Sequence, residues 1–196
     1  MHPRSTAGLL SRRSPPDEPP VRAVVLCAGA SSRMGRPKGL LLLDGVPLLR
    51  AHVDAFRRAG LPVTVVLGSA ASAHVATLPA GVHVVYNPRW HETDMAASAA
   101  LALRDAGEVL LTPVDVPPAR PETIARLLEG VGAAVPTWGG RPGHPIRLPA
   151  PHPAVRLETR VATARHVPVD DPDCVRNLNR PEDWATWLAE RAARRA

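Results

Sequence analysis

The chain has 196 residues, of which 45% are hydrophobic and 3% aromatic, and its formal net charge is +6. This length and apolar content suit one domain with a single core of Val, Leu and Ala rather than two domains. The basic balance comes from arginine pairs near the two ends of the chain, without interleaved aromatic residues, which argues against nucleic-acid binding.

The chain opens with MHPRSTAGLLSRRSPPDEPP, which lacks the apolar segment of a secretion signal. Its Pro, Ser and Arg content predicts a disordered leader over residues 1–20, so we expect one domain over residues 21–196. No window of the sequence reaches the length of a membrane span. Two cysteines are too few for a disulfide framework, and we expect a cytoplasmic protein with neither a membrane nor a nucleic acid as partner.

The first predicted strand, VRAVVL, is followed by the loop CAGASSRMGRPKG. Its glycines and serines leave backbone N–H groups unhindered, and Arg33 and Lys38 add positive charge beside them. Such a loop is typical of a site for an anion, most simply a polyphosphate. The phosphate-loop pattern GxxxxGK[ST] does not fit, because a glycine rather than Ser or Thr follows Lys38. The dinucleotide-binding pattern GxGxxG does not fit either, because its glycine spacing is absent. The second mismatch also argues against a dinucleotide-dependent oxidoreductase.

Helical and β-branched segments alternate along the rest of the chain. In VPLLRAHVDAFRRAG the apolar residues Val46, Leu49, Val53 and Phe56 recur every three or four positions, which predicts a helix. Strands are predicted in PVTVVLG, VHVVY and EVLLTPVD, and helices in SAASAHVATL, MAASAALALRDAG and ARPETIARLLEG. This alternation predicts an α/β fold of three layers, with helices on both faces of a mostly parallel sheet. Ligands bind such sheets beyond the carboxyl ends of the strands. The residues at or just after these ends are Cys27–Lys38, Gly68-Ser69, Tyr86–Pro88 and Pro113–Asp115.

The loop after the first strand resembles the signature LAAGxSxRMGxPK of the nucleotidyltransferases of molybdenum-cofactor maturation, with Cys27 in place of one alanine. Three later segments are similar to further elements of that family: TPVDVP to its metal-binding DxP, PTWGGRPGHPIRL to its GxPGHP, and RNLNRPEDW to its closing NxNTPEDL. The four elements cover the chain from about Val21 to Trp184. The resemblance implies a Rossmann-like nucleotidyltransferase fold of the GT-A-like group. It also implies transfer of CMP from CTP to the phosphate of a molybdopterin-type cofactor, with release of pyrophosphate.

The resemblance further implies a Mg²⁺ ion held by Asp115 and Asn179. Arg33 and Lys38 would act in catalysis by neutralising the triphosphate, and His144 would contact the acceptor. A general base is not required, because a phosphate nucleophile is already ionised at neutral pH. A molybdoenzyme or its chaperone is implied as a protein partner. The residues implied in nucleotide binding are Leu26, Ala28, Gly29, Ala30, Ser31, Ser32, Arg33, Lys38, Gly68 and Ser98.

Each of these assignments has a structural alternative. Arg33 and Lys38 could be solvated loop cations, Asp115 a turn or cap residue, and His144 a residue that shapes a turn. The alternative activities are guanylyl transfer to the same acceptor and nucleotidyl transfer to a sugar phosphate or another phosphorylated acceptor. A catalytically silent nucleotide-binding regulator is the alternative from another class of protein.

The end of the chain leaves a choice between two asparagines. Asn177 is the alternative to Asn179 as a metal ligand, and either could instead shape the entry to the last helix, where Pro181 suits the first turn. Trp184 and Trp187 are spaced three apart and are predicted on the buried face of that helix.

The base preference is predicted from the start of the loop. Relatives that transfer guanylate tend to begin it with LAGG and those that transfer cytidylate with LAAG, so the methyl group of Ala28 favours the smaller pyrimidine.

Two regions depart from the family. Thr93-Asp94 stands where relatives have glycine before Met-x-x-Ser, and a carboxylate there should repel phosphate unless it faces away. The segment between Leu148 and Val167 is shorter than usual.

Overall fold

The computed structural model describes residues 21–104, 106–150, 152 and 157–195. The leader predicted over residues 1–20 lies outside these described residues. The helices are α1 (Leu48–Arg58), α2 (Ala71–Val75), α3 (Met95–Leu103), α4 (Pro121–Leu128), α5 (Leu157–Ala162) and α6 (Pro181–Ala193). The main sheet contains β1 (Arg22–Cys27), β4 (Val63–Leu67), β5 (His83–Tyr86), β6 (Val109–Pro113), β7 (Ala134–Trp138), β8 (Arg141–Pro142), β9 (Ile146–Leu148) and β10 (Arg165–Pro168).

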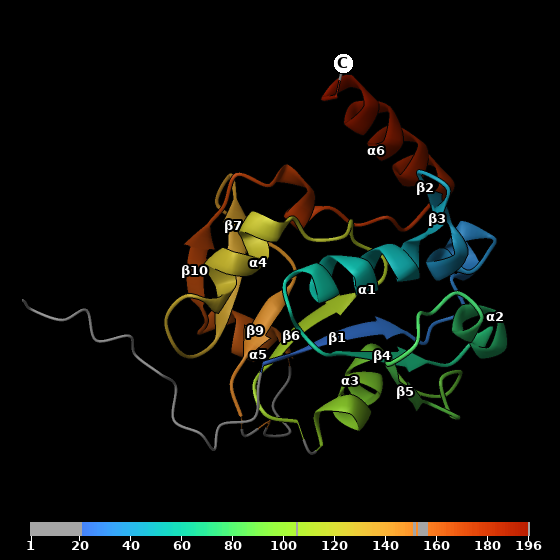
Figure 1. The fold of residues 1–196 in the computed structure, drawn as a ribbon, viewed down its shortest axis with the longest axis horizontal. Coiled ribbons are helices and arrows are strands. Elements are labelled where there is room, and N and C mark those ends of the chain that lie inside the picture. The colour runs from blue at the N-terminus through green and yellow to red at the C-terminus, as the bar shows by residue number, and fades with distance from the viewer. Residues whose placement is uncertain (1–20, 105, 151, 153–156, 196) are drawn as a thin grey trace, which may run out of the picture.

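The sheet has the strand order β10-β7-β9-β6-β1-β4-β5 (Figure 1). Strand β8 pairs with β7 beside this order. Strand β1 pairs in parallel with both β4 and β6, and β7 pairs in parallel with β10. Strand β9 is antiparallel to both of its neighbours, β6 and β7. The sheet is therefore mostly parallel, as predicted, with β9 inserted in the opposite direction.

Alternate residues of β1 face two separate apolar cores. Val25 points into a core shared with α1, α4 and α6, whereas Val24 points into a core shared with α3 and α5. Helices thus cover both faces of the sheet, and the predicted three-layer α/β/α arrangement is confirmed (Figure 1). Because β1 is buried on both faces, its carboxyl end is held rigidly where the loop CAGASSRMGRPKG leaves it.

Helix α1 begins at Leu48, two residues later than the apolar spacing from Val46 predicted. The reason is a second, two-stranded sheet in which β2 (Leu42–Leu43) pairs with β3 (Val46–Pro47). Asp44 and Gly45 turn the chain between them with φ angles of 52° and 80°. Such a pair is typical of a tight hairpin turn, so the local turn prevails over the helical spacing.

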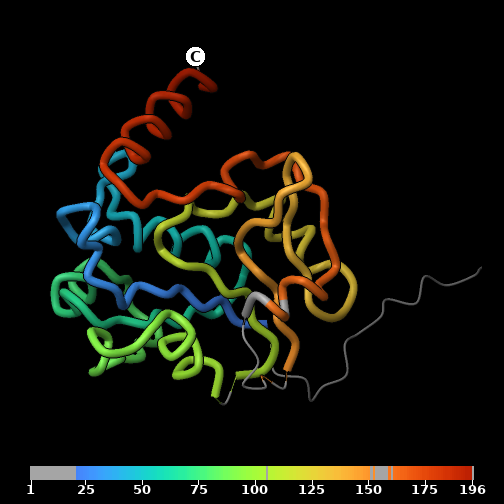
Figure 2. The backbone as a smooth tube through the Cα atoms, turned by 180° about the vertical axis from the view of Figure 1, so that it is seen from behind, coloured from blue at the N-terminus to red at the C-terminus, as the bar shows by residue number. Residues whose placement is uncertain are grey.

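Helix α6 begins with Pro181 in its first turn, and Trp184 and Trp187 are buried, both as predicted. The chain runs along the edge of the molecule from β10 to this helix, and α6 then projects away from the sheet (Figure 2). Within the described residues, no helix combines the length and the apolar character that crossing a membrane requires.

Strand β9 carries a buried charge, Arg147, that the sequence pattern does not predict. Its guanidinium donates to the carbonyl oxygens of Leu127, Leu128, Glu129 and Gly130, where α4 ends. It also forms a paired contact with both carboxylate oxygens of Glu108, at 2.7 and 2.8 Å. A buried charge is tolerated only when it is fully paired, and here it closes the end of a helix against the sheet.

Candidate functional site

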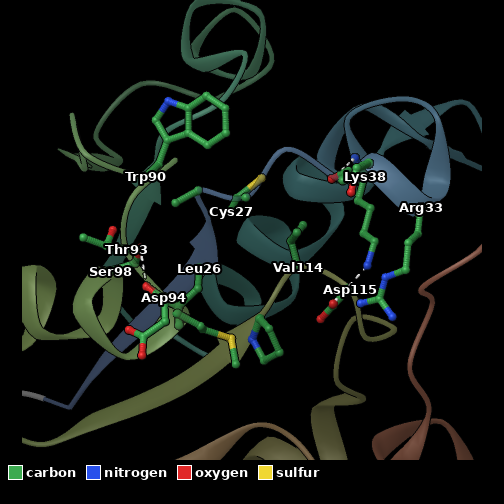
Figure 3. A pocket seen from close by; sticks show the side chains of 16 residues that line it. Leu26, Cys27, Arg33, Lys38, Trp90, Thr93, Asp94, Ser98, Val114 and Asp115 are labelled. Carbon is green, nitrogen blue, oxygen red and sulfur yellow. Dashed lines mark hydrogen bonds and ion pairs between the residues drawn. The ribbon is translucent and has the colours of Figure 1, made fainter.

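A cavity of about 240 Å³ lies beyond the carboxyl ends of β1 and β6 (Figure 3). Its wall combines the loop after β1, the segment that leads into α3, and the end of β6. The residues that line it are Leu26, Cys27, Ala28, Gly29, Ser31, Ser32, Arg33, Lys38, Trp90, Thr93, Asp94, Met95, Ser98, Pro113, Val114 and Asp115. This is the edge of the sheet where ligands of parallel α/β proteins bind.

The loop after β1 folds back on itself so that its cations face the cavity. Ser31 adopts a left-handed conformation with φ 56°, and its Oγ accepts a hydrogen bond of 3.1 Å from the backbone N–H of Lys38. A 3-10 helix, Ser32–Met34, lies between these two residues and ends at Gly35, whose φ of 73° closes the turn. Arg33, on that short helix, is exposed.

The ammonium of Lys38 joins two distant parts of the chain. Its Nζ donates to Oδ2 of Asp115 at 3.0 Å and to Oδ1 of Asn179 at 2.9 Å. The Lys38 side chain is only 9% exposed, whereas that of Asp115 is 31% exposed. Lys38 is therefore not the solvated loop cation of the alternative interpretation. A buried ammonium with two oxygen partners orders all three side chains.

Backbone hydrogen bonds hold Asp115 and Asn179 in these positions. The carbonyl of Asp115 accepts from the N–H of Leu178 at 2.6 Å, so the segment before α6 is bonded to the end of β6. The carboxylate of Asp183 accepts from the N–H groups of Asn179 and Arg180 at 3.0 and 2.8 Å. The start of α6 therefore determines where the amide of Asn179 lies.

The pair of oxygens on Asp115 and Asn179 fits a divalent cation. Both oxygens lie within hydrogen-bond distance of the same nitrogen, so they converge on one positively charged position. Carboxylate and amide oxygens are hard ligands of the kind that Mg²⁺ prefers, and Mg²⁺ commonly takes its remaining ligands from water and substrate phosphates. The described residues contain no cluster of three or more His, Cys, Asp or Glu that could hold a metal without a substrate.

The turn that carries Asp115 rests on a buried histidine. Nε2 of His52, on α1, donates to the carbonyl oxygen of Val116 at 3.0 Å. Burial lowers the pKa of His52 to about 4, and the hydrogen bond to Val116, the nearby backbone of Val114 and the charge of Asp115 only partly oppose that shift. The imidazole is therefore neutral at pH 7 and supports the turn without adding charge.

Close packing forms the back wall of the cavity behind Lys38. Sγ of Cys27 lies 3.5 Å from Nε2 of His74. A Cβ atom on Gly39 would come within 2.7 and 2.8 Å of these two side chains, so the position next to Lys38 accepts only glycine without a rearrangement. Burial raises the pKa of the Cys27 thiol to about 12, which excludes it as a nucleophile at neutral pH.

The opposite end of the cavity is built on Asn87. Its Nδ2 donates to Oγ1 of Thr93 and to Oγ of Ser98, both at 2.9 Å, and its Oδ1 accepts from the N–H of Arg89 at 3.0 Å. These bonds fix the segment that leads into α3. Trp90, on the same segment, packs over Gly68, where a Cβ atom would lie 2.5 Å from that of Trp90.

Asp94 lies in this wall as the N-cap of α3. Its Oδ1 accepts a hydrogen bond of 2.8 Å from the N–H of Ala97, and its side chain is exposed. The segment that departs from the family pattern therefore does contribute to the cavity, at the end away from Lys38 (Figure 3).

Most of the predicted nucleotide-binding residues line the cavity. Gly68 does not line it. It lets two backbone segments approach closely, because a Cβ atom there would lie 2.5 Å from the carbonyl oxygen of Ala28. Ala30 is exposed outside the lining. Asn179 reaches the site through Lys38, whereas Asn177 lines a separate cavity together with Trp138. Trp90 and Thr93 line the cavity but were not predicted, although their place after an Asn-Pro turn at a strand end was a usable signal.

His144 is half-buried and does not line the cavity. Its backbone N–H donates to the carbonyl of Cys174 at 2.8 Å, and Gly143 approaches the same carbonyl so closely that a Cβ atom would lie 2.1 Å from it. Burial lowers the pKa of His144, which the charge of Asp115 and the backbone of Leu111 partly oppose. These contacts connect His144 with the segment of Cys174. Its role toward an acceptor stays a prediction.

Comparison with known proteins agrees with this architecture. The sequence family described as the MobA-like NTP transferase domain matches residues 23–167. A 2-C-methyl-D-erythritol 4-phosphate cytidylyltransferase from Frankia casuarinae is 30% identical over 174 residues, which are 87% of this chain and 62% of the relative. A molybdenum cofactor guanylyltransferase from Xanthomonas euvesicatoria is 36% identical over 109 residues, 56% of this chain and 54% of the relative. The chain thus spans less than two thirds of the length of these curated relatives.

Solved structures resemble most of this chain. The crystal structure of Rv0371c from Mycobacterium tuberculosis has a TM-score of 0.72 at 27% identity, and the match covers 86% of this chain and 97% of that one. A structure of Rv0371c in complex with manganese has a TM-score of 0.68 at 24% identity, covering 86% and 98% of the two chains.

The buried imidazole of His52 predicts a specific dependence of stability on pH. Its pKa in the folded chain, about 4, lies below the ordinary value of 6.5, so the unfolded chain binds the proton first as the pH falls. The group therefore contributes fully above about pH 6.5, and its contribution is lost as the pH falls toward 4, by at most about 3 kcal/mol. Urea unfolding at pH 7 and pH 5 measures this loss.

A His52→Gln variant should show a weaker loss of stability between pH 7 and pH 5, because its side chain does not titrate. His91→Gln is the matched control, since His91 is exposed and pairs with Glu92. Equal pH dependence in the wild type and in His52→Gln would contradict the assignment.

Proposed function

The chain belongs to the family of MobA-like NTP transferase domains, and on that premise we propose that it transfers CMP from CTP to the phosphate of a molybdopterin-type cofactor. The observation that carries the proposal is the convergence of Lys38, Asp115 and Asn179 at the end of a phosphate-type loop. An oxygen of the acceptor phosphate would attack the α-phosphorus of CTP, and the bond to the leaving pyrophosphate would break. Both reactants are anions, so the protein contributes mainly by positioning and by charge.

Lys38 is suited to the triphosphate because of its remaining proton. An ammonium has three N–H donors, and Asp115 and Asn179 accept from Lys38 through two of them. The third is available for a phosphate oxygen, and when Asp115 and Asn179 hold a metal instead, the ammonium would turn to the phosphates with all three donors. Arg33 lines the same end of the cavity and is exposed, so its guanidinium can add a second positive contact.

Asp115 and Asn179 would hold Mg²⁺ through their converging oxygens. The metal, when bound, supplies positive charge against the developing charge on the phosphates. The manganese complex of Rv0371c supports a divalent-metal site for a protein of this architecture. The acceptor phosphate is ionised at neutral pH, so the neutral imidazole of His144 is not needed as a base.

Ala28 supports CTP as the donor. It is buried at 7% exposure and lines the cavity, so its methyl group limits the space there. A pyrimidine is smaller than a purine, and one modest clash or lost contact is worth about 1–3 kcal/mol in selectivity. The two curated relatives carry the names of a cytidylyltransferase and a guanylyltransferase, so the base has to be argued from the residues of this chain.

A second candidate is cytidylyl transfer to a phosphorylated sugar-type acceptor. It is favoured by the relative named for 2-C-methyl-D-erythritol 4-phosphate, which aligns with 87% of this chain. Purified protein supplied with Mg²⁺, CTP and either acceptor, with pyrophosphate release as the readout, separates the two candidates. If the protein does not accelerate pyrophosphate release with either acceptor, the silent nucleotide-binding regulator becomes the better description.

Replacement of Asp115 should separate catalysis from folding. Asp115→Asn removes the charge that would hold the metal but keeps an oxygen for Lys38, so we expect turnover to fall about a hundredfold or more with a small change in melting temperature. Asp54→Asn is the matched control, because Asp54 pairs with Arg50 on α1, outside the cavity. Full activity of Asp115→Asn, or of the wild type in EDTA, would remove Asp115 from the site.

The size of the residue at position 28 should determine whether the enzyme prefers a pyrimidine or a purine nucleotide. We expect kcat/KM for CTP to exceed that for GTP by roughly tenfold to two-hundredfold, and Ala28→Gly to reduce this ratio. Competition between CTP and GTP in one reaction gives the ratio directly. A wild-type preference for GTP would refute the choice of base while leaving nucleotidyl transfer in place.

A further inference from the structure

Ala28 cannot distinguish the two pyrimidines from each other. Cytosine and uracil have the same ring and nearly the same size, and they differ in the group at C4, which is an amine in cytosine and a carbonyl oxygen in uracil. Selection between them needs a hydrogen-bonding group at the end of the cavity that receives the base. The argument rests on the proposed function, in which a nucleoside triphosphate fills this cavity.

The charges of the cavity orient such a ligand. Arg33 and Lys38 lie at one end, where they outweigh the single charge of Asp115, and Asp94 lies at the other (Figure 3). A triphosphate is attracted to the cations and repelled by the carboxylate. The repulsion expected of Asp94 therefore acts where the base would lie, and the base is directed toward α3.

The two hydroxyl groups at this end are already committed. Oγ1 of Thr93 donates to the carbonyl of Arg89 at 2.9 Å and accepts from Asn87. Oγ of Ser98 donates to the backbone carbonyl of Asp94 at 3.4 Å and also accepts from Asn87. Each hydroxyl has a single proton, so neither has one left to donate to the carbonyl oxygen of uracil.

Asp94 has an uncommitted acceptor. Its Oδ1 accepts from the N–H of Ala97, and its Oδ2 accepts no hydrogen bond from the residues that the structure describes. The side chain is exposed and lines the cavity, so an amine of a ligand can reach this oxygen without displacing a protein donor.

We propose that Asp94 selects cytosine over uracil by accepting a hydrogen bond from the exocyclic amine of the base at its free carboxylate oxygen. A uracil carbonyl oxygen in the same place would face a negatively charged acceptor with no proton between them. The position thus combines attraction for the correct base with repulsion of the competing one. The capping bond to Ala97 keeps the carboxylate from turning away.

Isothermal titration of the protein with CTP and with UTP, each with Mg²⁺, tests the proposal without needing the acceptor. For the wild type we expect CTP to bind at least tenfold more tightly than UTP. Asp94→Asn should reduce that ratio to about threefold or less, because an amide can also donate to the uracil oxygen. Asparagine is as good an N-cap as aspartate, so the melting temperature should not change.

Glu92→Gln is the matched control. It removes the same charge two positions away, from a side chain that pairs with Arg89 and His91 and does not line the cavity, and it should keep the wild-type ratio. Equal affinity of the wild type for CTP and UTP, or an unchanged ratio in Asp94→Asn, would overturn the role of Asp94 and leave the proposed function standing. Failure to bind any nucleoside triphosphate would overturn both.

Discussion

The contact of the Lys38 ammonium with Asp115 and Asn179 is the interaction on which the rest of the site depends. Lys38 lies in the loop after β1. Its partners Asp115, after β6, and Asn179, before α6, are 77 and 141 positions away in the sequence. Burying an ammonium is costly unless charged or polar oxygens compensate it, so the lysine is stable only where these partners converge. The same arrangement collects positive charge and hard oxygen ligands at one end of a cavity beside an exposed arginine, which suits a ligand rich in phosphate.

Much of this architecture could be predicted from local pattern. The runs that became β1, β4 and β6 are apolar because those strands are buried on both faces. The spacing of Leu49, Val53 and Phe56 follows the buried side of α1. The rule that ligands bind beyond the carboxyl ends of parallel strands then directed attention to the loop after β1 and to Asp115. The roles of the individual residues in binding and catalysis stay predictions.

Other features depend on contacts between distant segments, which local pattern does not contain. The pairing of Lys38 with Asn179 arises because Leu178 bonds to the carbonyl of Asp115, and no spacing rule reveals this. His52 is indistinguishable from its helical neighbours until α1 is packed beneath the turn of Asp115. Asp94 was expected mainly to repel phosphate, whereas its position at the opposite end of the cavity gives that repulsion a direction. In each case the sequence identified the residue type but the packing determined its neighbours.

The central claim is that Asp115 and Asn179 form one cation site beside Lys38. The most direct test is a crystal structure of the protein with Mn²⁺ and a non-hydrolysable CTP analogue, in which anomalous scattering locates the metal. The account predicts a manganese ion bound directly by Asp115 and Asn179, with the Lys38 ammonium on the phosphates. A manganese ion bound elsewhere, with Lys38 still paired only to Asp115 and Asn179 while the analogue fills the cavity, would contradict it.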